Sequence, residues 1–145
     1  MKNLFLTTGF LFFTILSIAQ NKSTDVAGIW KTSGDDPAKI QIYAVGEKFY
    51  GKIIWLNKPI LNGKERVDIE NPDKAKRTQN IVGLQMLNGF EFNGSDSWNS
   101  GTIYDPKTGK TYSCTITFKD SKTIKVRGYI GISLLGRTEI WTKEI

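Results

Sequence analysis

One absence restricts the side chains that could do chemistry, because the 145 residues include no histidine. Histidine is the commonest general base and the commonest transition-metal ligand in proteins. A Ser-His-Asp triad or a Cys-His dyad is therefore impossible within one chain, and a zinc site would need cysteine and carboxylates alone. A phosphate-binding loop is missing too, since the glycine-containing segment 131–136 lacks the lysine that such a loop requires.

Cys114 is the single cysteine, and its neighbours indicate a structural role. Tyr112, Cys114, Ile116 and Phe118 alternate with small polar residues, and this period of two places all four on one face of a strand. A cysteine in such apolar company behaves as a small hydrophobe, and burial raises the pKa of its thiol. We expect Cys114 to lie in the core as an unreactive thiol.

A cluster of carboxylates and an amide offers one possible metal site. Asp68, Glu70, Asn71 and Asp73 place oxygen atoms at the close spacing that calcium prefers, but the spacing and the glycine of an EF-hand are missing. Helix capping by Asn71 and Asp73 explains the cluster more simply. We therefore predict no metal and no cofactor.

Carboxylates could also form a hydrolase that works without histidine. Such an enzyme would need two carboxylates facing each other across a cleft, and the sequence does not show which two would meet. The candidates are Asp68, Glu91, Asp105 and Glu139. Asp105 also fits as the first residue of a turn.

Noncovalent binding of a small molecule is the interpretation that we rank first. A binding pocket combines apolar walls with a few polar groups. Arg127 is the candidate polar anchor, because it shares a strand face with Tyr129 and an intervening glycine allows a ligand to approach closely. Ile124 and Val126 favour the opposite assignment, with Arg127 on the surface or paired with Asp68.

Aromatic residues are the candidates for the walls of that pocket. They are Trp30, Tyr43, Trp55, Trp98, Tyr112, Tyr129 and Trp141. The same residues would equally fill the interior of a small barrel and leave no cavity.

Eight strand-like segments would position these side chains, and short turns join most of them. Asn93-Gly94 is a strong hairpin signal, and the segment Asp105–Gly109 has proline and glycine where a tight turn needs them. The segments are Gly28–Thr32, Ala38–Val45, Phe49–Leu56, Leu84–Phe92, Ser97–Asp105, Lys110–Phe118, Thr123–Ile130 and Arg137–Lys143. Short turns favour antiparallel neighbours, and closure of the sheet removes its exposed edges. We predict an all-β fold, a small antiparallel up-and-down barrel, with a sandwich or half-open roll as the alternative.

The long polar segment 57–80 interrupts this series of hairpins. Asn62-Gly63 predicts a small extra hairpin, and Asn71-Pro72-Asp73 predicts the start of a short helix from Pro72 to Arg77. A loop of this length in a small domain is usually functional or mobile. It could lie over one mouth of the barrel.

The N-terminus has the features of a secretory signal peptide. Lys2 precedes an apolar run from Leu4 to Leu16, and Ser17-Ile18-Ala19 offers small residues for cleavage between Ala19 and Gln20. We expect residues 1–19 to be removed and residues 20–145 to form a single domain in the periplasm or the medium, with no stable membrane span. The formal net charge is +6, and the basic residues show no cluster interleaved with aromatics, so we expect no nucleic-acid partner.

Short motifs along the mature chain resemble those of a known family. They are Gly28-Ile29-Trp30, Gly51-Lys52-Ile53, Asp68, Asn71-Pro72-Asp73, Arg77, Gly83-Leu84, Trp98, Gly101 to Pro106, Gly109 to Tyr112, Arg127-Gly128-Tyr129 and Trp141. This family, known as domain of unknown function 2147, implies an exported single-domain β protein without an established reaction. One departure is that Thr78-Gln79-Asn80 follows Arg77, where the family often has a proline. Gly28-Ile29-Trp30 also resembles the opening of lipocalin/calycin-type barrels.

Three classes of function remain after these observations. The first is a non-catalytic binder of a small hydrophobic or amphipathic ligand, which needs an internal cavity with a polar anchor. The second is an envelope protein-protein interaction module, which would dock a partner through loop 57–80 (candidates Asp68, Asn71, Asp73 and Arg77) and needs an exposed apolar patch beside it. The third is the histidine-free hydrolase, which needs two perturbed carboxylates in a cleft.

Overall fold

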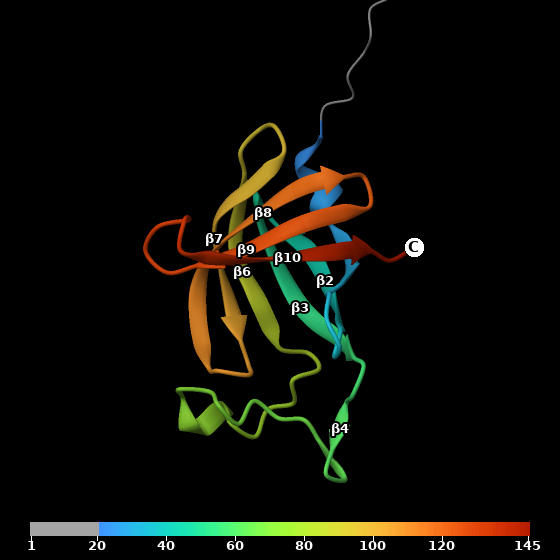
Figure 1. The fold of residues 1–145 in the computed structure, drawn as a ribbon, viewed down its shortest axis with the longest axis vertical. Helices are drawn as coiled ribbons and strands as arrows, with labels where there is room; N and C mark the ends of the chain where they lie inside the picture. Colours follow the sequence, from blue (N-terminus) through green and yellow to red (C-terminus); the bar gives the residue numbers. More distant parts are fainter. Residues whose placement is uncertain (1–20) are drawn as a thin grey trace, which may run out of the picture.

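Short connections join most of the neighbouring strands around a sheet that closes on itself (Figure 1). The computed structural model describes residues 21–145, so the predicted signal peptide and its cleavage site lie outside the described residues. The barrel strands are β1 (Gly28–Lys31), β2 (Ala38–Val45), β3 (Lys48–Leu56), β6 (Gln85–Phe92), β7 (Ser97–Asp105), β8 (Lys110–Asp120), β9 (Thr123–Tyr129) and β10 (Gly136–Lys143). Their order is β1-β10-β9-β8-β7-β6-β3-β2, and neighbouring strands run antiparallel. The prediction of an eight-stranded up-and-down barrel is confirmed.

The first and last strands form the seam that closes the barrel. Trp30 pairs with Lys143 and Lys31 with Thr142, while the Glu144 amide donates to the Ile29 carbonyl at 2.8 Å. This seam has fewer pairs than any other neighbouring pair of barrel strands. Because it removes both edges of the sheet, the sandwich and open-roll alternatives no longer apply.

Side chains alternate between the two faces of each strand, and the apolar ones point inward and fill the barrel. The largest fully buried residues include Trp30, Trp98, Trp141, Phe90 and Leu87. Cys114 is fully buried among them, as its strand pattern predicts, and burial raises the pKa of its thiol to about 12. Apolar packing is therefore the main source of stability.

A short 3-10 helix, η1 (Ser23–Val26), lies at one end of the barrel. The indole nitrogen of Trp98 donates to the Ser23 carbonyl at 3.0 Å, and that of Trp30 donates to the Val26 carbonyl at 2.8 Å. Val26 itself is fully buried. The two tryptophans thus hold η1 against the core, and their polar atoms are satisfied although the rings are buried.

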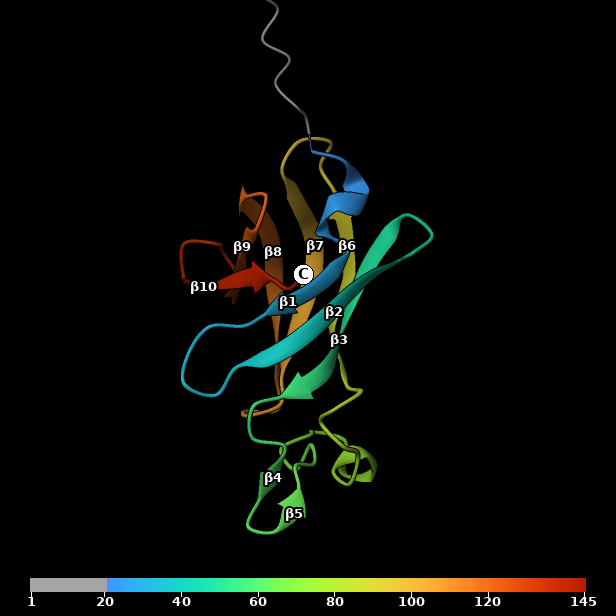
Figure 2. The same cartoon turned by 90° about the vertical axis from the view of Figure 1, so that its right-hand side faces the viewer.

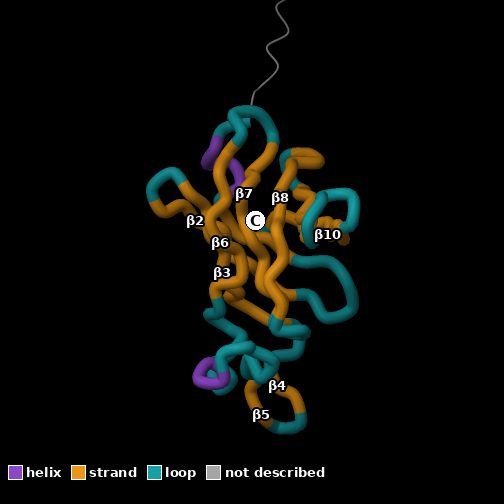
Figure 3. The backbone as a smooth tube through the Cα atoms, turned by 90° about the vertical axis from the view of Figure 1, so that its left-hand side faces the viewer, coloured by secondary structure: helices purple, strands orange, loops and turns teal. Residues whose placement is uncertain are grey.

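The connection between β3 and β6 lies at the opposite end, and we call residues 57–84 the strap. Figure 3 shows η1 and the strap helix η2 (Lys74–Lys76) at opposite ends of the molecule. The strap also contains the predicted Asn62-Gly63 hairpin, formed by β4 (Ile60–Leu61) and β5 (Lys64–Glu65).

The helix in the strap is shorter than predicted, and of the two predicted capping residues only Asp73 caps it. It covers three residues rather than the segment from Pro72 to Arg77, and Asp73 caps it by accepting from the Ala75 amide at 3.0 Å. Asn71 lies two residues before the N-cap position, and its side chain has other partners. Its amide nitrogen donates to Asp68 at 2.7 Å, and its oxygen accepts from the Asp73 amide at 2.9 Å.

A buried carboxylate fixes the strap to the barrel. Asp68 is fully buried, and its second oxygen accepts a 2.7 Å hydrogen bond from the Tyr104 hydroxyl on β7. Desolvation and the Asp68 bond raise the pKa of Tyr104 to about 12. Next to this bond, the Glu70 carbonyl lies so close to Gly109 that an added Cβ would be 1.9 Å from it. Arg77 closes the turn by donating from Nε to the Asn71 carbonyl at 2.7 Å.

A second contact fixes the other side of the strap. Arg66 donates to Asp36, in the β1–β2 loop, at 2.8 Å, and this ion pair is largely shielded from solvent. The strap is therefore attached to β7 on one side and to the β1–β2 loop on the other, as Figure 2 allows the reader to follow. Within residues 21–145, no helix has the length and apolar character needed to cross a membrane.

Burial predicts that Cys114 resists modification in the folded protein. The thiolate is the reactive form, and a thiol pKa of about 12 keeps it scarce at mildly alkaline pH. Iodoacetamide treatment followed by mass spectrometry should add no mass to the native protein and one adduct after denaturation in urea. Because the folded pKa exceeds the ordinary value of 9.0, the stability contributed by the neutral thiol should be lost as pH rises from about 9 through about 12. Rapid alkylation of native protein would contradict the buried position.

The bond between Tyr104 and Asp68 should contribute measurably to stability. Hydrogen bonds to charged groups contribute about 1.5–3 kcal/mol, so Tyr104→Phe should lower the free energy of unfolding in urea by about that amount. Amides of the strap should also exchange faster with solvent. Tyr43→Phe is the matched control, because its hydroxyl donates to Gln85 on an exposed face, and it should cost less than about 1 kcal/mol. Equal losses in the two variants would show that the strap is not held through Asp68.

Candidate functional site

A cavity of about 630 Å³ lies at the strap end of the barrel and is partly open to solvent. Its rim comes from the β1–β2 loop, the β7–β8 turn, the β9–β10 loop and the strap. The volume lies within the range of small-molecule sites. The barrel is therefore filled at the η1 end and hollow at the other.

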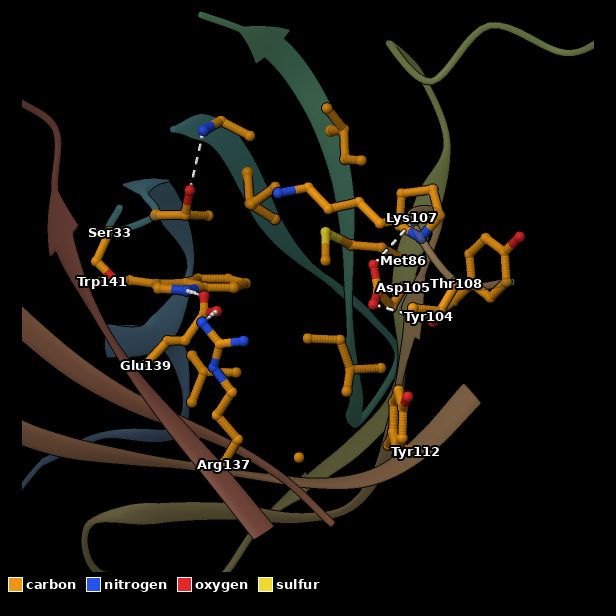
Figure 4. Close-up of a pocket in the computed structure, with 18 of the residues that line it drawn as sticks. Ser33, Met86, Tyr104, Asp105, Lys107, Thr108, Tyr112, Arg137, Glu139 and Trp141 are labelled. Atoms are coloured by element: carbon orange, nitrogen blue, oxygen red, sulfur yellow. Dashed lines mark hydrogen bonds and ion pairs between the residues drawn. The ribbon is translucent and has the colours of Figure 1, made fainter. Parts of the chain in front are cut away.

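Apolar side chains form most of the cavity walls. They come from β2, β3, β6, β7, β9, β10 and the strap, and they are Ile40, Ile53, Leu56, Ile81, Met86, Ile103, Val126 and Trp141. Tyr112 stands on β8 near the rim (Figure 4). Ile81 and Arg66 show that the strap supplies part of the wall, as expected for a loop over one mouth.

Two charged residues on β10 interrupt this apolar lining. Arg137 and Glu139 alternate with the buried Trp141, so all three share the inner face of the strand. Figure 4 shows the guanidinium of Arg137 beside the Glu139 carboxylate, with the Trp141 ring next to them. Together they form a polar edge beside the apolar part of the wall, which we call the β10 polar edge.

The Glu139 carboxylate is held loosely. Trp141 donates to it from the indole nitrogen at 3.3 Å, and the nearest Arg137 nitrogen lies 3.5 Å from its other oxygen. Both distances exceed the 2.7–2.9 Å of a strong charge-assisted hydrogen bond. The Arg137 side chain is 87% exposed, so it is free to change partner. Glu139 therefore keeps acceptor capacity that a ligand could use.

The rim carries four further charged residues, which are Asp36, Arg66, Asp105 and Lys107. Asp36 pairs with Arg66 through one oxygen, while its other oxygen, Oδ1, is buried and has no hydrogen-bond partner within the described chain. Lys107 extends from the β7–β8 turn across the cavity in Figure 4, and no carboxylate within residues 21–145 forms an ion pair with it. Asp105 accepts from the Lys107 amide and the Thr108 hydroxyl, which is the turn role that the sequence predicts.

The aromatic candidates separate into three groups. Tyr112, Tyr129 and Trp141 line the cavity. Trp30 and Trp98 are fully buried and bonded to η1, so they belong to the filled end. Ligand contact by the first group stays a prediction.

Tyr43 and Trp55 lie on the outer face, so the prediction that they line the pocket is wrong. Tyr43 stacks on Tyr50 and alternates with the inward residues Ile40 and Ile42. Trp55 would share a face with Ile53 in a regular strand, but a register shift between β2 and β3 turns it outward. Trp55 is 39% exposed, and its ring lies beneath the ammonium of Lys39.

Arg127 also lies outside the cavity and does not pair with Asp68. Its Nε donates to the Ser133 carbonyl and one terminal nitrogen donates to the Thr138 hydroxyl, both at 2.8 Å. Ile124 and Val126 are the buried residues of β9. This agrees with the alternative assignment, in which Arg127 lies on the surface. The polar edge lies instead on β10, the strand that pairs with β9.

The four candidate carboxylates for hydrolysis occupy different surroundings. Asp68 holds the strap, and Glu91 forms an exposed ion pair with Lys48. Glu139 lies in the cavity and Asp105 lies at its rim within a turn. Sequence reasoning named Glu139 only for this role. The alternation of Arg137, Glu139 and Trp141 was the signal that could have placed the polar edge.

The comparisons with known proteins agree with this architecture. A solved structure titled "Protein HP1028 from the human pathogen Helicobacter pylori belongs to the lipocalin family" is similar, with a TM-score of 0.74, 20% identity and 83% of each chain covered. At this identity the likeness shows the fold alone, so the barrel is lipocalin-like. Among curated proteins, no sequence relative matches. The model of the family described as "Uncharacterized protein conserved in bacteria (DUF2147)" matches residues 28–143, from β1 to β10, and the chain belongs to this family.

Proposed function

We propose that this protein is a non-catalytic, exported carrier of a small amphipathic ligand. The observation that supports the proposal most directly is the cavity of about 630 Å³ with apolar walls and the β10 polar edge. Such a combination favours a ligand with an apolar body and one polar end. The signal-like N-terminus supports the periplasm or the medium as its location.

The polar edge indicates which groups the ligand carries at that end. Glu139 has unused acceptor capacity. A ligand with an amine or hydroxyl group would supply the donor, while its apolar body would cover residues such as Ile53 and Val126. Arg137, which is loosely paired, would donate a hydrogen bond to a neighbouring oxygen of the ligand.

Native mass spectrometry tests the proposal without assuming a ligand. Protein exported from its full-length gene and purified without detergent should carry a reproducible added mass that is lost on denaturation. If only the bare mass is found, an added fluorescent probe such as 1-aminoanthracene should still bind. Failure of both would overturn the carrier proposal.

Filling the cavity should abolish binding while the barrel stays folded. Met86→Trp places a larger side chain in the cavity wall, and it should weaken the binding of 1-aminoanthracene at least roughly tenfold because the apolar space is lost. Gln85→Trp is the matched control, since the neighbouring residue is exposed and does not line the cavity. Fluorescence titration measures both, and equal affinities would place the probe outside the barrel.

Removing the charge of Glu139 should discriminate among ligands. Glu139→Gln should weaken 1-aminoanthracene, an amine donor, roughly tenfold, because hydrogen bonds to charged groups contribute about 1.5–3 kcal/mol. The anionic probe 1-anilinonaphthalene-8-sulfonate should bind equally well or better, since it gains nothing from the carboxylate. Fluorescence titrations of both probes measure the effect. The opposite order would assign the polar end of the ligand to Arg137 and Lys107.

A further inference from the structure

The β9–β10 loop exposes an unusual group of aliphatic side chains. Ile130, Ile132, Leu134 and Leu135 are 68%, 60%, 85% and 73% exposed. They lie within six consecutive residues, and the loop projects from the barrel wall in Figures 1 and 2. Soluble monomers rarely expose contiguous apolar patches without an interaction role. We call these four residues the aliphatic tip.

The loop that presents this tip has a defined conformation. Arg127 donates from Nε to the Ser133 carbonyl at 2.8 Å, and its Nη2 lies 3.4 Å from the Leu134 carbonyl. The Leu135 amide donates to the Ile132 carbonyl at 3.1 Å, which closes a turn within the loop. These bonds hold the backbone, so little conformational entropy would be lost if the aliphatic side chains bound a surface.

Two arginines flank the tip. Arg127 on β9 and Arg137 on β10 lie on its two sides, and Glu139, the acidic residue of β10, lines the cavity. Arg127 bonds only neutral acceptors, so no carboxylate cancels its charge within the described residues. Arg137 is largely exposed and loosely paired with Glu139. An apolar tip flanked by cations is complementary to a bilayer that carries anionic lipids.

We propose that the aliphatic tip is a membrane-docking site for the surface of an anionic bilayer. Ile132 and Leu134, which do not line the cavity, enter the interface, and Arg127 and Arg137 approach the lipid headgroups. Ile130 and Leu135 belong to both the tip and the cavity rim. The docked barrel would therefore hold its cavity close to the lipids. The proposal does not depend on the carrier function, because vesicle binding requires no ligand in the cavity.

Vesicle co-sedimentation tests the docking site directly. The exported protein should bind vesicles that contain phosphatidylglycerol and should bind pure phosphatidylcholine vesicles much more weakly, by about fivefold for each cation that reaches the surface. Raising the salt concentration should reduce the binding. The double variant Ile132→Ser/Leu134→Ser should bind at least roughly tenfold more weakly, because each serine loses the free energy gained when the aliphatic side chain is buried in the bilayer interface.

Matched controls separate docking from general stickiness. Val45→Ser/Ile69→Ser removes two aliphatic groups of similar exposure, 59% and 64%, that lie outside the loop, and it should leave vesicle binding unchanged. Thermal unfolding followed by circular dichroism verifies that both double variants fold. Leu134→Trp should shift its fluorescence to shorter wavelength on anionic vesicles, whereas Ile69→Trp should not.

Three results would overturn the proposal. The first is that the wild type fails to bind anionic vesicles, and the second is that the two double variants lose binding equally. The third is a dimer in size-exclusion chromatography that Ile132→Ser/Leu134→Ser dissociates, which would make a second copy of the chain the partner of the tip. Because 1-aminoanthracene binding reports on the cavity separately, loss of docking and loss of the carrier function remain distinguishable.

Discussion

The pairing of β1 with β10 is the constraint on which the rest of the molecule depends. This short seam changes a sheet with two open edges into a barrel with an inside and two ends. Once the barrel is closed, the alternation along each strand determines burial, because one row of side chains is enclosed and the other is exposed. The seam also brings Trp30 on β1 and Trp141 on β10 into a common interior.

The two ends of the barrel then use the same kinds of residue for different purposes. At the η1 end, Trp30 and Trp98 bond to backbone carbonyls, so aromatic volume and hydrogen bonding together exclude solvent. At the strap end, the wall is completed by a segment that is attached through buried polar contacts, and space remains inside. A filled interior and a hollow interior, which the aromatic composition left undecided, therefore coexist in one barrel.

Local patterns were sufficient for the strands, their turns and the burial of Cys114, because each depends on neighbours in sequence. The site depended on longer-range facts. A register shift turns Trp55 outward, and Asp68 finds its partner 36 residues away in Tyr104, so neither outcome can be read from a local period. Charged residues such as Glu139 are normally assigned to the surface, and a half-hollow barrel is the circumstance in which that assumption fails.

The position of the strap in the topology has a consequence for how such a barrel can diversify. The strap joins β3 to β6, which are neighbours in the sheet, so a tight turn would satisfy the topology equally well. It is thus an insertion within a hairpin, and doubling the length of such a loop costs only about 0.6 kcal/mol of closure entropy. Related barrels could exchange this segment and reshape the entrance while every strand register, and hence the folded framework, stays the same.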